Sequence, residues 1–154
     1  MNDHTSPVVP VSWGELLDKI MILEIKQTRI PDPEAQNHIA KELRLLRGIA
    51  VPAMEQALLA PLLTRLKIVN EALWEIEDSI RSREAISDFG ADFLRLARSV
   101  YKNNDERAAL KREINILLKS DLFEEKSYDH PSSAASAAVS PNANASPSFA
   151  PGER

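Results

Sequence analysis

Apolar residues in the first 120 positions recur at intervals of three and four, the spacing of one face of an α-helix. A capping box of Ser12 and Glu15 predicts that a first helix begins at Trp13. Pro31 predicts the end of this helix at Ile30, because proline has no amide hydrogen with which to continue it. The chain therefore opens with an amphipathic helix.

A second helix is predicted directly after the first. Asp32 and Pro33 offer an N-cap and a first-turn proline, and apolar residues continue at helical spacing to about Arg47. Gly48 and Pro52 then predict its end.

A third helix, from Leu62 to about Arg83, has the most regular apolar pattern in the chain, and Pro61 suits its first turn. The apolar stripe consists of Leu62, Leu66, Val69, Leu73, Ile76 and Ile80. The segment 88–90 is the only sharp break before the next helical region.

The last helical region, which begins near Phe93, has two interpretations. If one helix runs to Lys119, both Asn103 and Arg107 face the core. If the helix breaks at residues 103–105, a new helix starts there, and Arg107 lies one turn from the centre of its apolar stripe. The predicted fold is all-α, an antiparallel bundle of four to five helices.

Two opposite charges interrupt the predicted apolar faces. Glu24 falls near the centre of the first helix's apolar arc, whereas Asp18 falls on its solvated side. Arg107 interrupts the stripe of the last helix. Burying an ionised carboxylate without a partner is prohibitive, so Glu24 requires a cation, hydrogen bonds, a raised pKa or a wet pocket. Arg107 is the candidate cation.

The third helix carries further polar residues beside its apolar arc, and together with those of the other helices they form one candidate set. The candidate ligand-binding residues are Glu24, Asn70, Trp74, Glu77, Asn103 and Arg107. Helix bundles build ligand sites from such inward side chains, and a tryptophan beside amides and charges suits a sugar ring or an anionic metabolite. Alternatively, a buried pair of Glu24 and Arg107 only fixes the helix register, which is the more frequent role of polar groups inside bundles.

The composition excludes several classes of function. The chain has no cysteine, so it has neither a disulfide framework nor a thiolate site. Its net charge of -4 and the absence of a basic block argue against nucleic acid as a partner. The three histidines are scattered, so we expect no bound metal and no cofactor. Without a signal peptide pattern or a long apolar run, we expect a cytoplasmic protein with no membrane insertion.

Enzymatic constellations are also missing. There is no glycine-rich phosphate loop and no Gly-x-Ser-x-Gly motif. A general acid or base at Glu24 or Glu77, or an arginine that clamps a dianion together with Lys111, is the enzymatic alternative. We favour a role without catalysis.

The domain prediction has three parts. Residues 1–10 form a flexible N-terminus, residues 11–121 the helical bundle, and residues 122–154 a disordered tail. From about Ser127 the tail contains Ser, Ala, Pro and Asn without Leu or Ile, so it cannot bury enough apolar surface to offset the entropy of ordering.

The chain resembles a family of small bacterial proteins of unknown function. The resemblance rests on three blocks: PVSWGELLDKIMILEIK (10–26), VNEALWEIED (69–78) and ARSVYKNNDERAALKREIN (97–115). It covers residues 10 to about 119 and leaves out the tail after Ser120. It carries no catalytic residue over to this chain, and implies only a loose link to glycosyltransferase and surface-polysaccharide gene neighbourhoods.

These observations lead to two expectations for function. The first is a non-enzymatic cytoplasmic accessory protein, linked to surface polysaccharide or lipopolysaccharide biosynthesis and working with an unidentified protein partner. The second is a binding protein for a sugar or anionic metabolite, with a polar pocket in the bundle lined by Asn70, Trp74, Glu77 and Arg107. The sequence leaves the oligomeric state open.

Overall fold

The structure, a computed structural model, describes residues 6–127 and is built from helices. The elements are α1 (Trp13–Arg29), α2 (Pro33–Ala50), the 3-10 helix η1 (Val51–Glu55), α3 (Leu59–Ala85) and α4 (Ala91–Leu117). No strand occurs in this range, which confirms the all-α class. The compact helical unit extends to Glu124. The predicted flexible residues 1–5 and the predicted tail beyond residue 127 lie outside the described residues.

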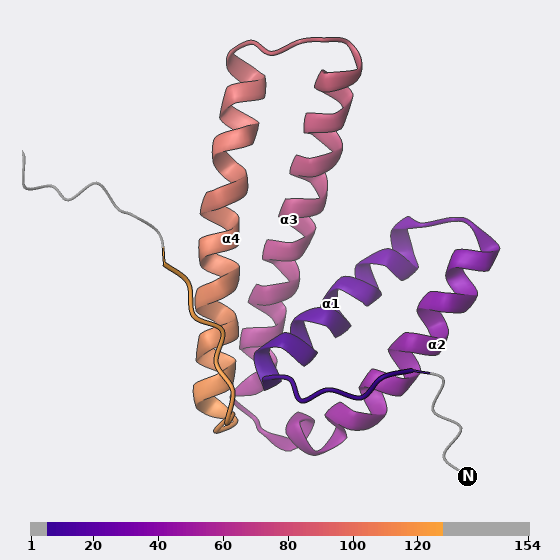
Figure 1. Ribbon diagram of the computed structural model, residues 1–154, viewed down its shortest axis with the longest axis vertical. Coiled ribbons are helices and arrows are strands. Elements are labelled where there is room, and N and C mark those ends of the chain that lie inside the picture. The colour runs from indigo at the N-terminus through magenta and orange to yellow at the C-terminus, as the bar shows by residue number, and fades with distance from the viewer. Residues whose placement is uncertain (1–5, 128–154) are drawn as a thin grey trace, which may run out of the picture. The chain divides into compact units, whose positions relative to one another are not determined.

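Two helical hairpins make up the helical unit (Figure 1). α3 and α4 run antiparallel and side by side, and α1 and α2 form the second hairpin. α1 is the central element because it packs against α2, α3 and α4. The largest fully buried apolar side chains belong to α1 and to the helices around it: Leu17, Ile20, Leu43, Leu59, Leu66, Leu110 and Ile114. The core therefore depends on α1.

The α3–α4 hairpin continues beyond α1 as a two-helix arm (Figure 1). No side chain between residues 71 and 109 is fully buried. At the tip of the arm, Arg83 forms ion pairs with Asp88 and, at 3.1 Å, with Asp92. The arm thus lacks a closed core, and its helices contact each other over half-buried side chains.

Local capping chemistry sets the helix starts that the sequence predicts. The hydroxyl oxygen of Ser12 accepts a hydrogen bond from the amide of Glu15 at 3.1 Å. At the start of α2, a carboxylate oxygen of Asp32 accepts from the amide of Ala35 at 2.8 Å. Both caps satisfy amide groups that have no partner within the helix.

Two helix boundaries differ from the sequence-based expectation. α3 begins three residues earlier than predicted, at Leu59. Gly48 does not end α2, which continues to Ala50; Pro52 instead occupies the first turn of η1.

α4 is unbroken, which decides between the two interpretations of this region in favour of one continuous helix. The side chain of Asn103 donates a hydrogen bond at 2.9 Å to the carbonyl of Ser99, one turn earlier. Asn103 therefore stays inside the helix instead of opening a new one.

The start of α1 is bound directly to the end of α4. The amide of Gly14 donates to the side-chain oxygen of Asn115 at 2.6 Å, and the amide of Trp13 donates to the hydroxyl of Ser120 at 3.2 Å. A Cβ atom added to Gly14 would lie 2.5 Å from the backbone carbonyl oxygen of Lys111. Only glycine permits this approach of the two helices.

We expect Gly14→Ala to destabilise the protein by about 1–3 kcal/mol, because the added methyl group collides with the backbone of α4. Gly48→Ala is the matched control: a Cβ there has nothing within 4 Å, so alanine's higher helix propensity should stabilise by about 0.5–1 kcal/mol. Urea unfolding of both variants measures the two values. Equal effects of the two substitutions would contradict the close contact at Gly14.

Candidate functional site

Asp18 of α1 is the most deeply buried charged side chain of the described residues, at 1% exposure. Its Oδ1 accepts hydrogen bonds from Nδ2 of Asn70 at 2.9 Å and from Nε of Arg107 at 3.0 Å. Its Oδ2 accepts a second bond from Arg107, through Nη2 at 2.5 Å. One carboxylate thus holds α1, α3 and α4 together, with a two-pronged arginine contact that gives both strength and fixed geometry.

Lys111 extends this buried charge cluster toward the start of α1. Its Nζ lies 2.7 Å from Glu15, 3.0 Å from Glu124 and 3.9 Å from Asp18. Burial alone would lower the pKa of Lys111, but the hydrogen bonds with Glu15 and Glu124 outweigh it and raise the pKa. The ammonium therefore stays charged at neutral pH.

Arg107 joins the buried cluster to the surface. The hydrogen bond with Asp18 raises the pKa of Arg107, and burial opposes this only in part. Its side chain is 27% exposed, and among the hydrogen bonds of residues 6–127 it uses Nε and Nη2 but not Nη1. Asp18 thus binds two nitrogens of the guanidinium, and the N–H groups of Nη1 are left without a partner among residues 6–127.

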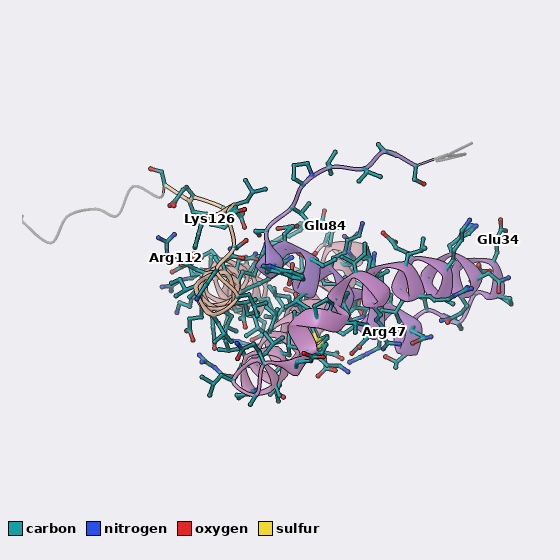
Figure 2. The ribbon with its side chains drawn as sticks, turned by 90° about the horizontal axis from the view of Figure 1, so that it is seen from below. Glu34, Arg47, Glu84, Arg112 and Lys126 are labelled. Carbon is teal, nitrogen blue, oxygen red and sulfur yellow. The ribbon has the colours of Figure 1, made fainter. Side chains whose placement is uncertain are left out.

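The prediction that Arg107 is the partner of Glu24 is wrong. Glu24 accepts hydrogen bonds from Arg47 at 2.8 Å and Lys67 at 3.2 Å, and the carboxylate that meets Arg107 is Asp18. Arg47 lies in the last turn of α2, and Figure 2 labels it there. Burial would raise the pKa of Glu24, but its two cations lower it below the usual value. Glu24 did need a cation, and two other helices supply it.

A groove of about 540 Å³ opens beside Arg107. Its lining comes from α1, α3 and α4 and consists of Ile22, Asn70, Leu73, Trp74, Glu77, Asp78, Arg81, Asn104 and Arg107. Four of the predicted site residues, Asn70, Trp74, Glu77 and Arg107, therefore lie on one groove. The other two do not line it: Glu24 binds its two cations, and Asn103 binds the backbone of its own helix.

Several polar groups of the groove remain available to a ligand. Within residues 6–127, neither the indole of Trp74 nor the amide of Asn104 makes a hydrogen bond to the protein. The pair of Glu77 and Arg81 is long, at 3.8 Å, and exposed. By contrast, no buried side-chain polar atom in the described range lacks a partner. The unpaired polar groups of the groove are therefore solvent-accessible, where a ligand can reach them.

The burial of Asp18 was not predicted, because the first helix was expected to have a single apolar arc with Asp18 on its solvated side. The observed buried residues cover more than half of the helix circumference, since α1 contacts three other helices. The signal was a second stripe with helical spacing, formed by Gly14, Asp18, Met21 and Ile25. A carboxylate flanked by glycine and two apolar residues on one face was the overlooked sign of burial.

A known family matches most of the chain. The sequence profile of DUF6165, described as a family of unknown function, matches residues 8–148. The chain belongs to the DUF6165 family. The match reaches well past Ser120, so the expectation that the tail lies outside the family is wrong. No curated protein and no solved structure matches this DUF6165 chain.

Residues 6–127 contain no group of three or more His, Cys, Asp and Glu side chains placed to hold a metal ion. None of the helices seen in this range combines the length and the apolar character needed to cross a bilayer.

The buried pair predicts a large coupling energy. We expect Arg107→Met to destabilise by about 3–5 kcal/mol, because it leaves the buried Asp18 carboxylate without its two-pronged partner. Asp18→Asn should cost less, about 1–3 kcal/mol, because the partly exposed Arg107 can turn to water. The double variant should lose much less than the sum. Glu24→Gln combined with Arg107→Met is the control and should be additive, since these residues share no partner. Additivity of the Asp18 pair in urea unfolding would refute the central contact.

The lowered pKa of Glu24 predicts a pH-dependent stability. A carboxyl group with a lowered pKa in the folded state stabilises above its unfolded pKa, about 4.3, and this contribution is lost as pH falls through the folded value. Wild type should therefore exceed Glu24→Gln in unfolding free energy at pH 7, and the difference should shrink below about pH 4. Urea titrations across this range measure it; a constant difference would contradict the two ion pairs.

Proposed function

We propose that this DUF6165 protein is a non-enzymatic binding protein that holds a small polar ligand in the groove between α1, α3 and α4. The observation that carries the proposal is the set of unpaired polar groups in the described groove: Nη1 of Arg107, the amide of Asn104 and the indole N–H of Trp74. Such convergent donors beside apolar surface are typical of ligand sites.

The groove is also preorganised. Asp18 fixes the guanidinium of Arg107 from behind, and the same carboxylate holds the amide of Asn70. Both groups project from long helices, which position side chains more accurately than loops do. A ligand that meets such a site loses less entropy to ordering the protein.

The chemistry of the lining favours binding over catalysis. The described lining residues include two carboxylates, Glu77 and Asp78, but no histidine, serine, threonine, tyrosine or lysine. Apart from these two carboxylates, the lining offers no side chain that serves as a nucleophile or a general base. This supports the non-enzymatic role expected from the sequence.

The wider setting is part of the same proposal. We place the protein in the bacterial cytoplasm, as an accessory protein of surface polysaccharide or lipopolysaccharide biosynthesis that works with a protein partner. The family resemblance of the three sequence blocks supports the bacterial setting and the polysaccharide link. The absence of cysteine from the whole chain fits a compartment that does not require disulfides.

Three variants test the groove. Asn104→Ala and Glu77→Ala should change the unfolding free energy by no more than about 0.5 kcal/mol, because their side chains are not needed by the buried cluster. In equilibrium dialysis against a low-molecular-weight bacterial extract, wild type should retain a small molecule that mass spectrometry detects, and Trp74→Ala should lose it. Tyr101→Ala, an exposed aromatic outside the lining, is the control and should retain it.

Retention of no small molecule by the wild-type protein would contradict the proposal. So would equal retention by Trp74→Ala and Tyr101→Ala, since the bound molecule would then lie outside the groove.

A further inference from the structure

The charges of the groove are already balanced within the protein. The lining holds two arginines, Arg81 and Arg107, and two carboxylates, Glu77 and Asp78. Asp18 adds a negative charge directly behind Arg107, at hydrogen-bond distance from two of its nitrogens. The lining as a whole therefore presents no surplus of positive charge.

A phosphate or carboxylate ligand is poorly matched to this arrangement. It would share Arg107 with the bound Asp18 carboxylate and would lie in the same groove as Asp78. Anion sites in proteins present several uncompensated donors or cations, which repay the desolvation of the anion. The net charge of -4 of the chain also gives an anion no long-range attraction.

A neutral ligand with many hydroxyl groups fits the side chains of this lining better than an anion does. Trp74 lines the groove with its half-buried ring, beside the apolar side chains of Ile22 and Leu73. An aromatic ring next to apolar side chains suits the C–H face of a pyranose. Hydroxyl groups both donate and accept hydrogen bonds, so they can use an N–H edge such as that of Arg107 and a carboxylate such as Asp78 without a net charge.

We infer that the groove takes a neutral sugar ring, an inference that rests on the proposed binding function and narrows its ligand class. The ring packs against Trp74, the free Nη1 of Arg107 and the amide of Asn104 donate to its oxygens, and Asp78 accepts from a hydroxyl. Asp18 is a positioning residue, which acts through Arg107.

Saturation-transfer NMR on the full chain tests the ligand class, because it detects weak binding. The neutral probes are glucose, galactose, mannose and N-acetylglucosamine; the charged probes are glucuronate, glucose 6-phosphate and choline. At least one neutral sugar should bind, and charged probes should bind at least about tenfold more weakly. Trp74→Ala should weaken binding about tenfold or more, and Asn104→Ala about three- to tenfold.

The matched control for Asn104→Ala is Asn103→Ala. The two asparagines are neighbours on α4, but Asn103 binds the carbonyl of Ser99 and does not line the groove, so its removal should leave the affinity unchanged. Tighter binding of glucuronate, glucose 6-phosphate or choline would overturn the neutral-sugar inference and leave the proposed groove function standing. Binding of none of the probes would overturn the neutral-sugar inference, while the dialysis experiment decides the proposed groove function separately. Equal losses in the two asparagine variants would overturn both, since the bound sugar would then not depend on the groove.

Discussion

The structure depends on one buried carboxylate. Asp18 lies on the central helix and is the point at which α1, α3 and α4 are joined by hydrogen bonds. A carboxylate in this position is not itself a source of stability, since its desolvation offsets much of the attraction to Arg107. What it contributes is geometry, because the bonds to Arg107 and Asn70 can form only when the three helices are in this register.

The same carboxylate connects the core to the groove. Arg107 is fixed on its buried side and open on its groove side, so packing and ligand recognition share one side chain. The groove takes Ile22 from α1 and its other lining residues from α3 and α4, so all three helices joined by Asp18 also contribute to the groove. Half-buried polar groups are stable there because water or a ligand can reach what the protein leaves unpaired.

The sequence predicted local features well and tertiary partners poorly. Ser12 and Asp32 mark helix starts because a cap involves residues only three positions apart. The stripe of Asn70, Trp74 and Glu77 placed three residues on one groove for the same reason. The partners of Glu24 and of Asp18 depend on which helices surround α1, and no periodicity along one chain contains that information.

The contact between Gly14 and α4 also has a consequence for folding kinetics. One of its hydrogen bonds joins residues that are 107 positions apart in the sequence, and the other joins residues that are 101 positions apart. Each helical hairpin, by contrast, forms from segments that follow one another directly. Closing so long a loop is entropically unfavourable until both hairpins exist. The junction of the first and last helices should therefore form late, as the step that converts two hairpins into one cooperative unit.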